Sequence, residues 1–138
     1  MNLFVPYEIA KSLKDKGFDV PCFAKYFEMD KNSDVKELVS NNPNHLYNFN
    51  EMLMDENDPN SNIMISAPIY DSVIDWFQSK NIFIETQLDQ TSGVKFSYEI
   101  TSIIDNEFKR STNIESWSLY YDKHKALDQA IIESINLI

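Results

Sequence analysis

The clearest pattern of apolar and polar positions in the chain lies between Ala67 and Leu88. Over residues 68–80 the apolar side chains recur at helical spacing and occupy one arc of roughly 160°. They are Ile69, Tyr70, Val73, Ile74, Trp76 and Phe77. Pro68 suits the first turn of a helix, where its missing N–H has no partner to lose. The pattern predicts an amphipathic helix that packs on a core and ends near Asn81.

After this helix the periodicity changes to two, which is typical of strands. Residues 82–88 and 94–100 alternate, and the segment between them has turn composition, so the two form a predicted hairpin. Residues 102–110 fit either a continued second strand or a bend after Asp105–Asn106. A last strand is predicted over residues 116–121, where Trp117, Leu119 and Tyr121 alternate with other side chains.

Asp122 is a natural N-cap for a closing helix over residues 123–138. Ile132 falls outside the apolar arc of that helix, so it is either a lone exposed residue or a partner contact. Near the start of the chain, residues 6–16 form a predicted helix that ends at Gly17, with Phe18 positioned to contact Leu13. Strands are predicted over residues 21–29 and 35–39.

Together these elements predict a single α+β domain over residues 1–138. Its core, residues 63–138, contains a largely antiparallel, twisted sheet with two helices on one face, in the order α-β-β-β-α over residues 67–138. The helix and hairpin of residues 1–39 would extend or cover that sheet. The asparagine-rich segment 40–62 would be a long loop.

The loop is too apolar for an idle linker. Its apolar side chains are Leu46, Tyr47, Phe49, Met52, Leu53 and Met54. Either they pack back onto the core, or some of them bind a partner protein. Under the second interpretation the candidate partner-binding residues are Tyr47, Phe49, Met52 and Met54.

The net charge of −10 is divided evenly, with −5 in residues 1–66 and −5 in residues 67–138. Duplex binding relies on Lys and Arg, so this balance argues against a nucleic-acid partner. No apolar run approaches the roughly 20 residues that span a bilayer, and the first residues have no secretory signal pattern. The single cysteine fits a reducing compartment. We therefore expect a cytoplasmic protein that does not contact membranes.

Sequence motifs for catalysis or cofactor binding are missing. Two glycines cannot build a phosphate-binding or dinucleotide-binding loop. Cys22 has no neighbour in sequence that would activate it, and the histidines His45 and His124 lack zinc-site spacing with it. Asp71 and Asp75 lie on the polar face of their helix. We therefore predict no catalytic, cofactor-binding or metal-binding residues.

A calcium loop is also excluded. Residues Asp58, Asn60 and Asn62 imitate its first three ligand positions. The required glycine is replaced by Ile63 and the bidentate glutamate by Ile69, so the match fails where geometry is most demanding.

The order α-β-β-β-α is also that of a double-stranded-RNA-binding module, and Lys123–Lys125 begins the last helix with basic residues. Such modules clamp phosphates with Lys and Arg. Residues 67–138 contain six basic and eleven acidic residues, so the electrostatic requirement is not met. A shared fold does not by itself give a shared function.

Three stretches carry a family resemblance: VPYEIAKSLKDKGFDVPCFAKY, SAPIYDSVIDWFQSKNIFI and YYDKHKALDQAIIESINLI. They resemble a group of small uncharacterised proteins from phages, plasmids and other mobile elements of Bacteroides-type gut bacteria. The resemblance covers both ends and the middle of the chain, but it carries no assigned activity. It does not extend to residues 40–62 and 102–115.

These observations leave three functional hypotheses. The first is a non-enzymatic accessory protein of a mobile element that acts by binding another protein. The second is an acidic decoy that imitates nucleic acid and occupies a host nuclease or DNA-binding protein. The third is an enzyme of unrecognised type, which would need a concave pocket that holds titratable groups with perturbed pKa values.

Overall fold

A computed structural model describes residues 3–28, 36–52, 63–89, 95–112, 120 and 122–138. The described chain contains three helices and two three-stranded antiparallel sheets, which confirms the α+β class. It divides into two compact units, which we call unit 1 (Leu3–Ile69) and unit 2 (Tyr70–Ile138). Each unit has its own sheet and its own buried residues.

Unit 1 begins with helix α1 (Tyr7–Asp15), which is one residue shorter at each end than the helix predicted over residues 6–16, and Pro6 is its N-cap. Gly17 has a φ of +82°, a left-handed conformation that favours glycine. The Phe18 N–H donates to the Leu13 carbonyl over 3.0 Å, and the Gly17 N–H donates to the Lys14 carbonyl over 2.9 Å. This is the predicted Schellman ending, and it directs the buried Phe18 side chain back onto the core.

The sheet of unit 1 consists of β1 (Ala24–Glu28), β2 (Lys36–Ser40) and β3 (Ile63–Ser66), in the order β2-β1-β3. The predicted hairpin is therefore present as β1 and β2. The prediction was wrong about residues 63–66, which we placed in the C-terminal core. They instead pair with β1, in a register that sets Ile65 opposite Tyr26 and buries Ile65.

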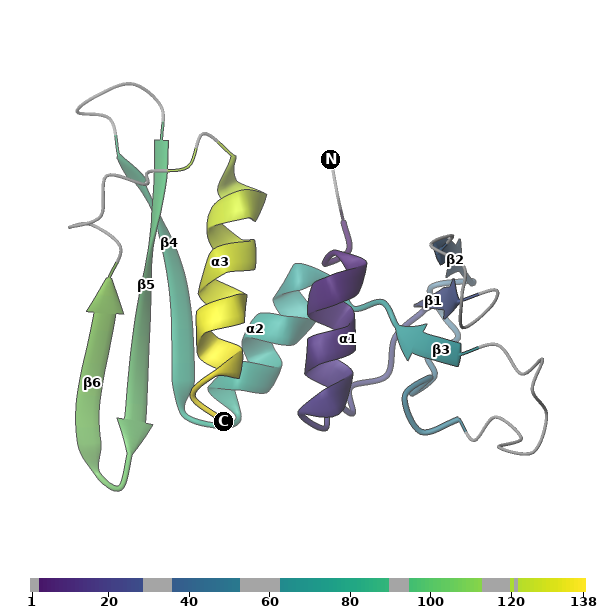
Figure 1. Ribbon diagram of the computed structural model, residues 1–138, viewed down its shortest axis with the longest axis horizontal. Helices are drawn as coiled ribbons and strands as arrows, with labels where there is room; N and C mark the ends of the chain where they lie inside the picture. Colours follow the sequence, from purple (N-terminus) through teal and green to yellow (C-terminus); the bar gives the residue numbers. More distant parts are fainter. Residues whose placement is uncertain (1–2, 29–35, 53–62, 90–94, 113–119, 121) are drawn as a thin grey trace. The chain divides into compact units, whose positions relative to one another are not determined.

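Unit 2 contains α2 (Tyr70–Gln78), β4 (Ile82–Asp89), β5 (Lys95–Ile104), β6 (Glu107–Thr112) and α3 (Lys123–Ile135). The strands lie in the order β4-β5-β6, and both pairs are antiparallel. Helix α3 packs on β4 and β5, and α2 packs on β4, so both helices lie on one face (Figure 1). The predicted order α-β-β-β-α is confirmed.

The position of the third strand differs from the prediction. β6 follows a two-residue turn at Asp105 and Asn106, whose φ values are +54° and +64°. Two successive positive φ angles define the turn whose twist matches a hairpin, and Asp and Asn tolerate this conformation well. The predicted strand residues Trp117, Leu119 and Tyr121 lie outside the described residues. Between them, Tyr120 forms an isolated antiparallel bridge with Phe96.

The closing helix shows the expected two-sidedness. The side chains of Ala126, Ala130 and Ile131 are completely buried, while the neighbouring Ile132 is 43% exposed. Asp122 caps the helix as predicted, since its Oδ1 accepts a hydrogen bond from the His124 N–H over 2.8 Å.

Candidate functional site

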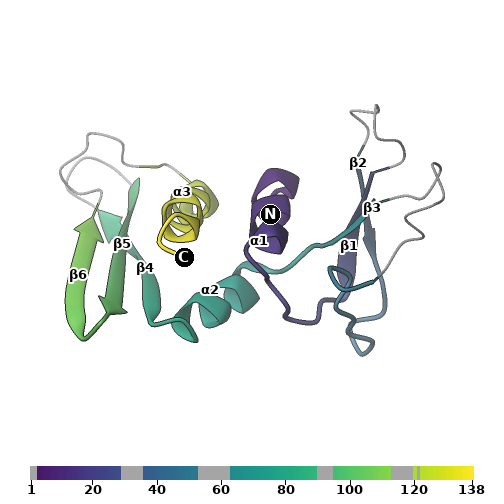
Figure 2. The same cartoon turned by 60° about the horizontal axis from the view of Figure 1, so that its bottom comes forward.

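A groove lies between β6 and the C-terminal end of α3. β6 is the outermost strand of its sheet, beyond the strands on which α3 mainly packs (Figure 2). The face of the sheet that carries the helices is therefore left partly open over β6. The resulting groove has a volume of about 330 Å³. Its lining residues are Ile100, Ser102, Lys109, Arg110, Ser111 and Leu137.

The strand register explains how these residues meet. Ile100 pairs with Ser111, and Ser102 pairs with Lys109, so these four side chains lie on one face of the sheet. The buried Ile100 gives the groove an apolar base, and Leu137 is a partly exposed apolar residue at its helical side. The serines supply hydroxyl groups within this apolar surface, which suits a ligand with both apolar and polar groups.

The charge of the groove is opposite to that of the chain as a whole. Its lining residues include Lys109 and Arg110 but no Asp or Glu, in a protein with a net charge of −10. Arg110 Nε lies 3.1 Å from Glu99 Oε1, and the register places that ion pair on the opposite face of the sheet. Lys109 is exposed, and no ion pair joins it to another described residue. Lys109 is therefore the cation available to a ligand in the groove.

The outer edge of β6 also presents backbone groups. The Ile103 N–H donates to the Asn81 carbonyl over 2.9 Å, so Ile103 directs its backbone groups toward the β4 side of β5. Because these directions alternate along an antiparallel strand, Ser102 and its partner Lys109 exchange ladder hydrogen bonds. The residues on either side of Lys109 in β6, Phe108 and Arg110, must then point their N–H and C=O groups away from β5. In the described part of the chain, β6 pairs with β5 alone.

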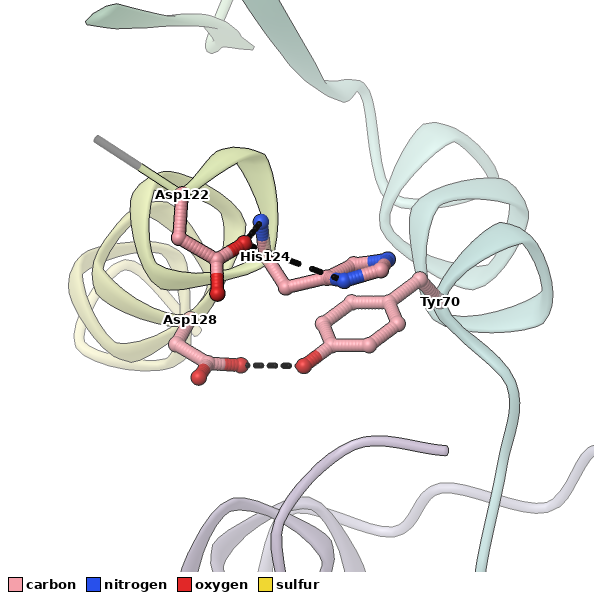
Figure 3. Close-up of polar contacts among 4 residues, drawn as sticks. All are labelled: Tyr70, Asp122, His124 and Asp128. Carbon is pink, nitrogen blue, oxygen red and sulfur yellow. Dashed lines mark hydrogen bonds and ion pairs between the residues drawn. The ribbon is translucent and has the colours of Figure 1, made fainter. Parts of the chain in front are cut away.

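A polar cluster links the two helices of unit 2. The Tyr70 hydroxyl donates to Asp128 Oδ1 over 2.7 Å, and the Tyr70 ring stacks on His124 with 4.7 Å between ring centroids (Figure 3). His124 Nδ1 lies 3.9 Å from Asp122 Oδ1. Tyr70 begins α2, and the other three residues lie in the first turns of α3 or cap it. The cluster therefore fixes the start of α2 against α3.

Burial raises the pKa of the Asp128 carboxyl above its ordinary value of 3.8. The Tyr70 hydroxyl, His124 and Lys125 act in the opposite direction, and the nearby Asp122 adds to the increase. None of the four residues in the cluster lines the groove. Both carboxylates already accept hydrogen bonds from the protein, so the cluster is best explained as a link between helices.

The Tyr70→Phe variant should raise the pKa of Asp128 further. The lost hydroxyl donates to the carboxylate, and a hydrogen bond to the charged form lowers a carboxyl pKa. A carboxyl-carbon NMR titration of wild type and variant measures both midpoints. A midpoint that stays the same or falls in the variant would show that this hydrogen bond is absent in solution.

The raised pKa of Asp128 also makes the stability of the fold depend on pH. Because the pKa of Asp128 is raised in the folded state, the folded protein binds more protons than the unfolded chain between 3.8 and the raised value. The contribution of Asp128 to the free energy of unfolding therefore decreases as the pH rises through this window.

A second link between helix and sheet positions the wall of the groove. The Tyr98 hydroxyl of β5 donates a hydrogen bond to Glu133 Oε1 of α3, and Gln129 Nε2 lies 3.4 Å from the same oxygen. Burial is the main cause of the raised pKa of the Tyr98 phenol, and the contact with Glu133 adds to the increase. The phenol therefore stays protonated as a donor, which holds α3 over β5.

The partner-binding residues predicted from the sequence belong to unit 1, and those that the structure describes do not line the groove. Tyr47 is 44% exposed and Met52 is 41% exposed, whereas Phe49 is 2% exposed. The Tyr47 backbone forms an antiparallel bridge with Cys22. Met54 lies outside the described residues. Phe49 therefore packs into the core, and a binding role stays a prediction for Tyr47 and Met52.

The candidate reactive groups are placed as follows. Cys22 is buried, and burial raises the pKa of its thiol to about 11. A protonated thiol is a poor nucleophile. Asp71 and Asp75 are exposed, and His45 is exposed in unit 1. Within the described ranges, no group of three or more His, Cys, Asp and Glu residues is arranged to hold a metal ion.

Sequence reasoning missed the groove, because it placed the third strand over residues 116–121. The signal that was available is the Asp105–Asn106 pair, which is typical of a two-residue hairpin turn.

Among the described residues, no helix is both long and apolar enough to cross a membrane. No family model, no curated protein and no solved structure matches this chain.

Proposed function

We propose that this chain is a non-enzymatic protein that binds a polypeptide segment of another protein in the groove between β6 and α3. The observation that carries the proposal is the exposed Lys109, which belongs to the edge strand β6 and lies beside apolar lining residues. Apolar surface supplies affinity in such sites, and a few placed polar groups supply specificity. The apolar lining residues are the buried Ile100 and the partly exposed Leu137.

The perturbed titratable groups support binding over catalysis. An enzyme of unrecognised type would hold such groups in its pocket. The described groups with shifted pKa values are Cys22, Tyr98 and Asp128, and none of them lines the groove. A place among the accessory proteins of mobile elements remains a proposal that rests on the sequence resemblance.

The Lys109→Glu variant tests the proposal. The immobilised full chain is incubated with a lysate of a gut-bacterial host, and the amount of each captured protein is compared between variants. Charge reversal beside the bound segment should weaken capture about tenfold or more. Lys11→Glu makes the same change at an exposed position of α1 and should retain capture. Both lysines are exposed, so neither change should disturb the fold.

Two results would contradict the proposal. One is equal capture of a salt-resistant partner by wild type and Lys109→Glu. The other is a loss of capture in a Tyr47→Ser, Met52→Ser variant, which would locate binding in unit 1. A basic partner that salt releases and DNA displaces, regardless of Lys109, would instead favour the acidic decoy.

A further inference from the structure

We infer that the bound segment is an extended strand that pairs with the outer edge of β6 and carries an acidic side chain opposite Lys109. This inference rests on the proposed function and adds the conformation and the chemistry of the partner. Three features support it: the outward direction of backbone groups in β6, the charge of Lys109, and the like charges that pairing with a second copy would bring together.

The backbone geometry favours strand addition. The β5–β6 register and the direction of the Ile103 N–H leave the N–H and C=O groups of Phe108, Arg110 and Thr112 pointing away from β5. An extended peptide that lies about 4.8 Å from β6 would satisfy these groups. Every second side chain of that peptide would then lie on the face that carries the groove.

The charges indicate which side chain the peptide would carry. On the face opposite the groove, Arg110 is already paired with Glu99. On the groove face, Lys109 is exposed and the lining contains no carboxylate. Opposite charges in neighbouring strands stabilise their pairing, so an acidic residue of the peptide belongs beside Lys109. An apolar residue two positions away would lie on the same face.

Two of the antiparallel registers in which a second copy of this chain could pair with the edge are unfavourable. Two β6 strands that pair antiparallel about a two-fold axis centred on Arg110 would set one Arg110 opposite the other. The register centred on Lys109 would set lysine opposite lysine. Like charges that face each other destabilise strand pairing, and charged side chains at an edge commonly prevent such self-association. The same charges would attract an acidic strand from a different protein.

Selection from a displayed library of random peptides of about ten residues, the upper length of ordinary strands, supplies the probe. The full chain is the bait, and Lys109→Glu serves for counter-selection. The enriched peptides should contain an acidic residue and an apolar residue two positions apart. Their affinity is then measured for Arg110→Pro and for Arg110→Ala.

Arg110→Pro should bind the peptide roughly tenfold more weakly than Arg110→Ala, because proline removes one outward N–H donor while both variants lose the guanidinium. The donor that proline removes makes no bond to β5, so the sheet should persist. Hydrogen exchange on the wild-type protein provides a second measurement that does not depend on the fold of the variant. The amides of Phe108, Arg110 and Thr112 should exchange more slowly when the peptide is bound.

The outcomes separate the inference from the proposed function. Failure to enrich any peptide that distinguishes wild type from Lys109→Glu would overturn the proposed function. A different result would overturn strand addition alone. In that result, binding depends on Lys109, but Arg110→Pro and Arg110→Ala bind the peptide with equal affinity, and amide exchange along β6 is unchanged. Enriched peptides that lack acidic residues would overturn the assigned partner chemistry.

Discussion

Replacing Phe49 with alanine is expected to lower the free energy of unfolding of unit 1 by about 3–5 kcal/mol. The Phe49 ring is almost completely buried, lies 5.7 Å from the Tyr47 ring between centroids, and has the Lys25 ammonium 5.1 Å from its centroid. The next residue, Asn50, bonds to the Phe18 carbonyl and to the Ser66 N–H. The asparagine-rich segment is therefore part of the core of unit 1 at this position.

The measurement is a urea titration followed by the NMR signals of β1 and β3. Met52→Ala is the control, because Met52 lies three residues further along the segment and is 41% exposed. It should change the free energy of unfolding by less than about 0.5 kcal/mol. Similar small effects of both substitutions would mean that Phe49 is not packed in solution, and they would restore its predicted role as a partner-binding residue.

The Ile131→Ala variant is expected to destabilise unit 2 by about 2–5 kcal/mol. Ile131 is completely buried on the face of α3 that packs against the sheet. Its truncation removes apolar contacts and leaves a cavity that closely packed neighbours fill only in part. Because α3 forms one wall of the groove, the same change should also weaken peptide binding.

Ile132→Ala is a matched control for this variant. It removes the same atoms from the next residue of the same helix, but Ile132 is 43% exposed. Urea denaturation followed by the NMR signals of β4 and β5 should show a loss of less than about 0.5 kcal/mol. If the two substitutions cost the same, α3 does not pack on the sheet through the face described.

Local sequence patterns predicted the elements whose conformation is set by neighbouring residues. The ending of α1 at Gly17 and Phe18, the cap at Asp122 and the alternation along β4 and β5 all follow from contacts within a few positions of the chain. The burial of Ile131 beside the exposed Ile132 also follows from helical periodicity.

Two features required information that local pattern does not contain. Residues 63–66 form an extended segment with three apolar residues, but its pairing with β1 depends on which sheet offers a free edge. Predicting the third strand required a choice between residues 107–112 and residues 116–121. The chain turns at Asp105–Asn106, so the less apolar residues 107–112 form the pairing strand.

The groove is a consequence of that second feature. Its volume depends on how far β6 extends beyond α3, which no periodicity reports. The exposed apolar residues Tyr47 and Met52 were visible as candidates because they interrupt a polar segment. Lys109 was not visible, because a single lysine in a strand becomes distinctive only when the register places it beside Ile100 and the end of α3.

Chemical-shift mapping of the library-selected peptide on the isotope-labelled full chain tests the central claim most directly. We predict that the largest amide shifts fall along β6 and at Ile100, Ser102 and Leu137, with little change at Tyr47 and Met52. Shifts that are centred on Tyr47 and Met52, with those of β6 unchanged, would contradict the account and assign binding to unit 1.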